Sequence, residues 1–399
     1  MKKAQDPTCK DVKEKKLYGF IRKDEALPPL HLVGDVAGKE ARTPLEGVEA
    51  RAARWKDRWT RDKAEQDKLI AAMHMLDELA GRPEHRREPI SSGQVEAARK
   101  QIKDDAGKGP DQVTGPWLGA VAPQGQEDLA KLLTLVEEEH VWPWQLTIVW
   151  TAMLPKDQKG DQERPICLLA QLVRLWNVIR KPVGQTWSAG LQAHWDKAIK
   201  GSSALRAALA RAVKAESALA KGFAVAGTFV DWEKFYDNTG LCDLFWEAFK
   251  HRYHPLDLLL AVQYYLGPRF IKVSGCLSEA IIPFNSLAAG CGQAKNFTTA
   301  LLYDMLEEAH KIDPLGIMRV DQYVDDLSQV AAGSTRQVAG ALSAGMSVLK
   351  KGSKRLRLTF SVKTTMVASS QELEAMLDDD LTKQEAPHTV GTSVMGCRC

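Results

Sequence analysis

The chain has 399 residues, 44% of them hydrophobic and 26% charged, and a formal net charge of +3 at pH 7. This is the composition of an ordinary soluble globular protein, and the net charge alone does not indicate a nucleic-acid partner. No run approaches the roughly 18 apolar residues of a membrane span. Residues 1–6 lack the apolar core of a signal peptide, so no membrane partner is expected.

The cysteines are scattered along the chain and odd in number, which argues against a disulfide framework and predicts a reducing, intracellular compartment. They are Cys9, Cys167, Cys242, Cys276, Cys291, Cys397 and Cys399.

Residues 1–90 are predicted to form an N-terminal arm followed by a basic helical extension. Residues 1–45 are polar and contain several Gly and Pro. Residues 46–80 hold strong helix formers and clustered basic side chains, with Trp55 and Trp59 on one helix face. We favour an amphipathic helix whose basic side is solvated and whose Trp face lies in the core. The alternative is a basic face that contacts nucleic acid.

Residues 91–222 form the second predicted region. A helix capped by Ser92 extends to about Lys103, and a Gly/Pro loop follows. Hydrophobic spacing and composition predict the remaining elements. These are a helix at 127–140, a strand at 145–154, a helix at 170–181 and an Ala-rich helix at 201–221.

Residues 223–370 form the third predicted region, in which strands and helices alternate. The predicted elements are a strand at 223–230, a helix at 241–252, a hairpin of 270–274 with 280–284, a helix at 293–310, a hairpin around Tyr323, a helix at 335–350, and strands at 356–362 and 366–368. This order predicts an α+β fold with a compact antiparallel sheet backed by helices.

Two adjacent carboxylates, Asp325 and Asp326, follow Tyr323 and Val324 at the expected tip of the last hairpin. Like charges at a hairpin tip repel each other, which suggests that a cation is bound there. The alternative is an ordinary polar turn, because Asp favours turns through local hydrogen bonds.

A third carboxylate, Asp231, stands where the predicted strand 223–230 ends. Two strands of one sheet could bring Asp231 to Asp325 and Asp326. Three converging carboxylates would bind two Mg²⁺ ions roughly 3.5–4 Å apart, with Mn²⁺ as an alternative ion. One ion would activate an attacking hydroxyl, and the other would stabilise a leaving phosphate.

Six segments, in order between residues 94 and 370, resemble the reverse transcriptases of non-LTR retrotransposons and group II introns. Each segment is a weak signal alone, but six in family order are strong. They are Gly109-Pro110-Asp111; Leu154-Pro155-Lys156 with Arg164-Pro165-Ile166-Cys167-Leu168-Leu169; Asp231 to Asp237; Gly290-Cys291-Gly292-Gln293; Tyr323-Val324-Asp325-Asp326; and Ser361-Val362-Lys363-Thr364.

The resemblance implies the fingers and palm of a right-hand polymerase, with residues 91–222 as fingers and 223–370 as a ferredoxin-like palm. It implies an RNA-directed DNA polymerase, a nucleotidyltransferase that takes an RNA template, a DNA or RNA primer and dNTPs. The thumb is expected to be missing, because residues 371–399 read as a polar tail or a truncated start of one. A fragment or a retroelement-derived remnant is therefore expected.

The resemblance also implies roles for individual residues. Asp231 and Asp325 would be metal ligands, with Asp326 as a third, more peripheral carboxylate. Lys156 and Arg164 would hold the triphosphate, although Arg164 read alone is a surface Arg before a Pro.

Three further residues receive roles from the resemblance. Tyr236 would block a ribose 2′-hydroxyl, which is compatible with a core aromatic. Gln293 would lie against the template or the incoming base. Lys363 would be a proton donor near the pyrophosphate, or one more Lys on a basic strand.

The sequence departs from the family at the segment that begins at Gly290. Gln293 is followed by Ala294 instead of Gly, and the family's later Ser-Pro pair is replaced by Thr298 and Thr299. Ala has less backbone freedom than Gly, so template handling is affected more than metal binding.

Two alternatives to an active RNA-directed DNA polymerase remain open. One is a catalytically weakened remnant that binds nucleic acid. The other is an RNA-dependent RNA polymerase, although that class usually has Gly at the position of Val324 and lacks an aromatic at that of Tyr236.

Overall fold

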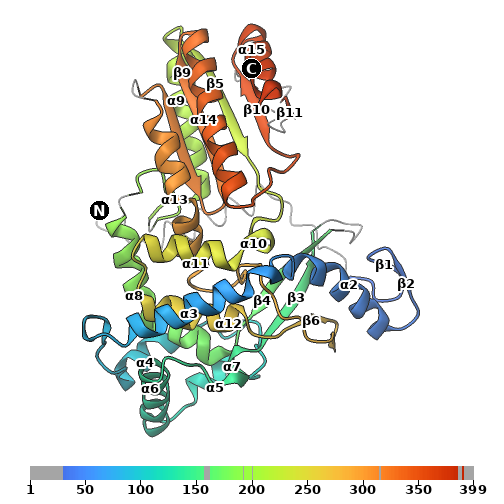
Figure 1. Ribbon diagram of the computed structural model, residues 1–399, viewed down its shortest axis with the longest axis vertical. Helices are drawn as coiled ribbons and strands as arrows, with labels where there is room; N and C mark the ends of the chain where they lie inside the picture. The colour runs from blue at the N-terminus through green and yellow to red at the C-terminus, as the bar shows by residue number, and fades with distance from the viewer. Residues whose placement is uncertain are drawn as a thin grey trace, which may run out of the picture.

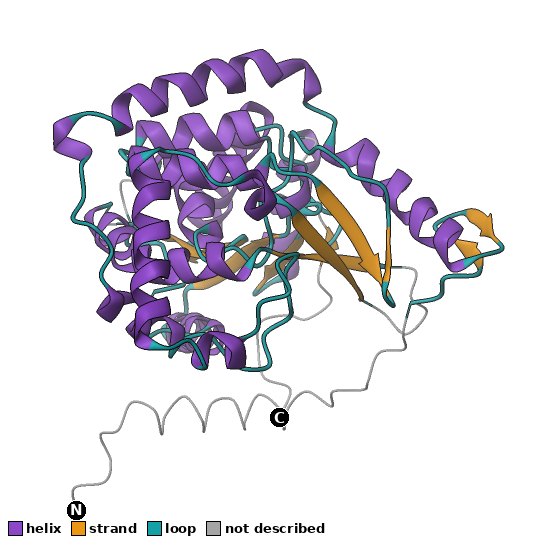
Figure 2. Cartoon of the chain, turned by 90° about the horizontal axis from the view of Figure 1, so that it is seen from below, coloured by secondary structure: helices purple, strands orange, loops and turns teal. Residues whose placement is uncertain are grey.

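The structure is a computed structural model of the α+β class (Figure 1). It describes residues 30–156, 162–191, 193–199, 201–313, 316–384 and 389–390. Two sheets hold the strands of the body, and helices surround both of them (Figures 1 and 2). No helix in these ranges is long and apolar enough to cross a membrane.

The larger sheet has five strands in the order β11-β10-β5-β9-β8. The strands are β5 (Ala224–Val230), β8 (Met318–Tyr323), β9 (Asp326–Gly333), β10 (Thr365–Ala368) and β11 (Thr389–Val390). The pairs formed by β8, β9, β5 and β10 are antiparallel, as expected for residues 223–370, and β11 adds a parallel edge. The helices α9 (Ala204–Ala220) and α14 (Thr335–Arg355) pack on β5 and β9.

The second sheet has four strands in the order β4-β3-β6-β7. They are β3 (Val149–Pro155), β4 (Glu163–Leu168), β6 (Arg269–Val273) and β7 (Cys276–Leu277). The hairpin expected at 270–284 therefore belongs to this sheet and not to the larger one. The physical reason is the parallel pairing of β6 with β3, two strands that a long connection separates in the sequence. No local sequence pattern reveals such a pairing.

Of the other helices, α15 (Gln371–Lys383) lies beside β10 and α13 (Ala294–Lys311) packs against α14, and most of the rest form the body around the four-stranded sheet (Figure 1). The bounds of the rest are α2 (Pro44–Trp59), α3 (Gln66–Ala80), α4 (Ser92–Arg99), α5 (Gly115–Gly119), α6 (Pro123–Glu138), α7 (Trp144–Thr147), α8 (Gln171–Gly190), α10 (Phe235–Asn238), α11 (Leu241–Lys250) and α12 (Pro255–Tyr265). A small hairpin of β1 (Gly34–Val36) and β2 (Lys39–Ala41) precedes α2.

Several expected elements differ from the structure. The cap of α4 is Ser91, not Ser92, because Ser91 forms a reciprocal capping box with Gln94. Residues 145–147 belong to the short helix α7 and not to the strand. In its hairpin, β6 pairs with Cys276–Leu277 and not with residues 280–284. Of residues 280–284, only Ile281 pairs with β6, through an isolated bridge to Arg269.

Two errors have a clear physical cause. The helix α12 was missed because nearly all of its residues are apolar and buried, so no polar face reveals a helical period. The basic strand expected at 356–362 is wrong. There α14 runs on to Arg355, and Arg357 then takes a left-handed backbone conformation (φ 56°).

The helix α2 is part of the core, as the favoured interpretation of its Trp pair requires. Trp55 and Trp59 are buried, with ring centroids 5.5 Å apart. The carboxylate of Glu163 on β4 accepts hydrogen bonds from Arg51 (2.5 Å) and Arg54 (3.0 Å) of α2. The carbonyl of Trp59 accepts from the backbone N–H of Phe284 at 2.7 Å. The N-terminal helix therefore holds distant segments together.

The buried pair of Arg51 and Glu163 provides a test of this docking. We expect Glu163→Gln to lower the free energy of unfolding by about 3 kcal/mol, because the Arg51 guanidinium would stay buried without a counter-charge. Urea denaturation measures the change. Glu139→Gln, at an exposed position, is the matched control and should be nearly neutral. Equal effects of the two changes would contradict the docking.

Candidate active site

The pairing of β5 with β9 brings the three carboxylates of interest to one end of the larger sheet. Val230 lies opposite Leu327 in the antiparallel register. Asp231 directly follows Val230, and Asp326 directly precedes Leu327, so the two carboxylates leave neighbouring strands at the same level. Asp325 lies in the turn between β8 and β9.

The turn that carries Asp325 is strained. Tyr323 pairs with Asp326, which leaves a two-residue loop of Val324 and Asp325. Val324 has φ 61°, a left-handed value that is rare for a β-branched residue and costs about 1–3 kcal/mol. Gln322 donates a side-chain hydrogen bond to the Val324 carbonyl at 2.8 Å and holds the loop in place.

The backbone of Asp231 is fixed by the segment between α14 and β10. The Asp231 carbonyl accepts from the backbone N–H of Ser361 (2.7 Å) and from the hydroxyl of Thr364 (3.2 Å). Next to it, the rings of Trp232 and Phe360 stack at 4.9 Å. This contact also brings Lys363 to the same end of the sheet.

The carboxylates repel one another. Burial, followed by the charges of Asp326 and Asp231, raises the pKa of Asp325 to about 6, and Arg164 opposes the shift. Burial and the charge of Asp231 also raise the pKa of Asp326, while Arg211 lowers it. Three carboxylates supply only oxygen donors, the kind that hard cations such as Mg²⁺ accept, so their chemistry fits such an ion.

A hollow of about 410 Å³ opens beside these carboxylates. Asp231 and Asp326 line it together with three basic residues, Lys156, Arg211 and Lys363. Lys156 and Lys363 are exposed. A triphosphate is the kind of anion that such a mixture of basic side chains and cation-binding carboxylates can hold.

Two more of the expected residues interact electrostatically with Asp325. Tyr236 lies on α10, and burial together with the charge of Asp325 raises the pKa of its hydroxyl to about 12. Arg164 is an exposed residue of β4 whose positive charge acts on Asp325. The hydroxyl of Tyr236 therefore stays protonated at neutral pH.

Gln293 does not line this hollow. Its side chain is buried, accepts from the Tyr253 hydroxyl at 2.9 Å and donates to Asn177 at 2.8 Å. It borders a separate cavity of about 600 Å³ that Asn177 and Gly292 also line. Contact between the Gln293 amide and a template would require these hydrogen bonds to break.

Sequence reasoning missed Arg211 and the role of Asp237. Arg211 lies on α9, and only the packing of α9 against β5 brings its charge to the carboxylates. Asp237 is buried and accepts a hydrogen bond from the Trp59 indole at 3.0 Å, so it anchors α2. The link between residues 59 and 237 has no local sequence signal.

Basic residues cluster at 350–357, a pattern that could follow a phosphate backbone. In the structure most of them pair with carboxylates of this chain. Lys351 pairs with Glu308, Arg355 with Glu247, and Arg357 with Asp243 and Glu65. Nucleic acid would have to displace these ion pairs to bind there.

The raised pKa of Asp325 allows two separate tests, one of folding stability without metal and one of stabilisation by Mg²⁺. Its pKa of about 6 in the folded chain lies above the ordinary aspartate value of 3.8, so ionisation costs folding free energy as pH rises from about 4 to 6. Without metal, Asp325→Asn should therefore raise the free energy of unfolding at pH 7.5 by about 1–2 kcal/mol, a gain that vanishes near pH 4. Thermal unfolding at both pH values measures it.

Mg²⁺ should stabilise the wild-type chain more than Asp325→Asn, because the ion binds only the folded carboxylates. The exposed Asp57→Asn is the control and should respond to Mg²⁺ like the wild type. A Mg²⁺ response that is unchanged in Asp325→Asn would contradict the assignment.

No protein-family model matches the sequence, and no curated protein matches it. Among solved structures, 383 chains match, including apo telomerase from Candida tropicalis truncated from its C-terminal domain. That match has a TM-score of 0.41 and 14% identity, and it covers 57% of this chain and 51% of the telomerase chain. The present chain thus spans about half the length of that structure, and a likeness of this degree identifies neither an activity nor a substrate.

Proposed function

We propose that this protein is an RNA-directed DNA polymerase that joins a dNTP to the 3′-hydroxyl of a primer. The observation that carries the proposal is the β5–β9 register, with Val230 opposite Leu327. It sets Asp231 beside Asp326, and the two-residue turn adds Asp325. Nucleotidyl transfer by two metal ions needs such a group of carboxylates at the edge of an open hollow.

In this proposal Asp231, Asp325 and Asp326 hold the Mg²⁺ ions. When bound, the ions would polarise the primer hydroxyl and neutralise charge on the leaving pyrophosphate. Burial and the charges of Asp326 and Asp231 raise the pKa of Asp325, and a bound cation would favour its ionised form by offsetting both effects.

The basic residues of the hollow would bind the triphosphate. Lys156 and Lys363 line it from separate loops, and Arg211 lines it from α9. Lys363 would also be able to give a proton to the pyrophosphate, since it is exposed at the same end of the sheet. Arg164 would add positive charge beside Asp325.

Tyr236 would limit the sugar that can bind. Its ring is partly buried next to Asp325, where a nucleotide held by the ions would place its ribose. A rigid aromatic ring at that point excludes a 2′-hydroxyl by contact. This separates the proposal from the alternative of an RNA-dependent RNA polymerase.

Primer extension tests the activity. The wild-type chain should extend a primer on an RNA template with dNTPs and Mg²⁺, and Asp231→Ala or Asp325→Ala should lower the rate by at least about 1,000-fold. Asp57→Ala, at an exposed position on α2, is the control and should keep full activity. Wild-type extension that survives both active-site changes would sink the proposal. Absence of extension together with Mg²⁺-independent RNA binding would favour the inactive remnant.

The sugar selectivity is tested separately. Tyr236→Ala should raise NTP relative to dNTP incorporation by about 10–100-fold, because the space for a 2′-hydroxyl would open. Single-nucleotide incorporation with each nucleotide type measures the ratio. Tyr303→Ala, on α13, is a control that should leave the ratio unchanged. A wild-type chain that already prefers NTPs would instead support the RNA polymerase alternative.

A further inference from the structure

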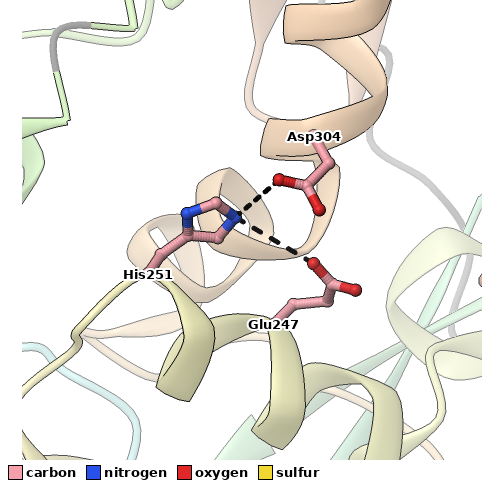
Figure 3. Close-up of side chains that lie close together, drawn as sticks. All are labelled: Glu247, His251 and Asp304. Atoms are coloured by element: carbon pink, nitrogen blue, oxygen red, sulfur yellow. Dashed lines mark ion pairs between the residues drawn. The ribbon is translucent and has the colours of Figure 1, made fainter.

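A second group of potential metal ligands lies outside the carboxylates described above. Glu247 and His251 are one turn apart on and just after α11, and Asp304 faces them from α13 (Figure 3). One ligand atom of each residue lies within 4.8 Å of the others. The His251 Nε2 atom is 3.1 Å from Asp304 Oδ1 and 4.0 Å from Glu247 Oε2.

Two of the three atoms that face one another are buried and make no hydrogen bond within the part of the chain that the structure describes. They are His251 Nε2 and Glu247 Oε2. The side chain of Glu247 is only 9% exposed. A buried carboxylate oxygen without a partner is costly, and a cation between it and the imidazole would satisfy both.

The other oxygen of each carboxylate is already held. Arg355 of α14 pairs with Glu247 Oε1, and Lys250 pairs with Asp304 Oδ2. These contacts turn Oε2 and Oδ1 toward the imidazole (Figure 3). Metal-binding carboxylates commonly have such outer partners, which orient the ligand oxygens.

We propose that Glu247, His251 and Asp304 bind a divalent transition-metal ion, with Zn²⁺ as the ion that fits best. Zn²⁺ takes imidazole and carboxylate ligands at about 2.0–2.2 Å, so tetrahedral ligand atoms lie about 3.3 Å apart. The Nε2 atom of His251 is already 3.1 Å and 4.0 Å from the two carboxylate oxygens, and all three atoms lie within 4.8 Å of one another, so side-chain rotation would bring them to this spacing. A fourth position would be open to water, because the Asp304 side chain is 27% exposed.

The site is chemically distinct from the three aspartates. An imidazole ligand selects a transition metal over Mg²⁺, which prefers oxygen donors alone. The ion would link α11 to α13 and, through Arg355, to α14. Its role would be to join α11 and α13 to each other and to α14, which packs on the larger sheet, so the inference is independent of the polymerase proposal (Figure 1).

Lys250 allows a test of the proposed zinc site, because its positive charge competes with a metal ion for the Asp304 carboxylate. Zn²⁺ binding to the full chain is measured by competition with a chromophoric chelator in excess Mg²⁺, which keeps the three aspartates supplied with their own ion. Asp304→Asn should weaken binding at least about 100-fold, and His251→Ala should abolish it at this site. Lys250→Gln should tighten binding about 10-fold. His74→Ala, an exposed imidazole on α3, is the matched control and should change nothing.

X-ray absorption of the zinc-loaded wild-type chain should show nitrogen and oxygen ligands and no sulfur, which separates this site from the cysteines. A wild-type chain that binds no more Zn²⁺ than Asp304→Asn would overturn the proposal. Unchanged affinity in Lys250→Gln would also overturn it, and this variant is surface-exposed and expected to fold.

Discussion

The pairing of β5 with β9 is the constraint on which the candidate active site depends. It forces Asp231 and Asp326 to lie side by side, against their mutual repulsion, and brings Asp325 near them. The backbone hydrogen bonds of the antiparallel strands and the apolar residues beneath them offset that repulsion. A shift of one residue in this register would turn every side chain of one strand to the opposite face and separate the acids. Register, more than any single side chain, therefore determines whether this edge of the sheet can hold cations.

Around that edge, segments far apart in the sequence are tied by buried polar contacts. Asp111, in the Gly109-Pro110-Asp111 loop, accepts from the backbone N–H groups of Gln171 (2.5 Å) and Leu172 (3.3 Å), so it caps α8 from 60 residues away. A Cβ atom on Gly109 would lie 2.2 Å from the carbonyl oxygen of Leu169, so only Gly fits this approach. The loop is thus fixed to the segment where β4 ends and α8 begins.

Local chemistry made the strands β5, β8 and β9 and the helices α9, α13 and α14 predictable within a few residues, because each has a clear apolar run or period. The same reasoning predicted that Asp231 and the Asp325 turn could meet, since both stand at the ends of strands. It failed for α12, which has no polar face, and for the sheet of β6, whose partner β3 is over a hundred residues away. It also missed Arg211, and it gave no sign of the internal contacts that Gln293 and Arg357 make. Tertiary packing brings Arg211 to the acids, hydrogen bonds hold Gln293 elsewhere, and ion pairs engage Arg357.

The docking of α2 and α3 has a consequence for how the protein is made. These helices leave the ribosome before their partners, which are Glu163, Asp237, Phe284 and, through Glu65, Arg357. Until those residues have been synthesised, the Trp55 and Trp59 rings have no core to enter. Contacts of such long sequence separation form late, because loop closure must precede them. The α2 and α3 helices should therefore stay exposed until these partners emerge, a period in which a chaperone that shields apolar surfaces would be most useful.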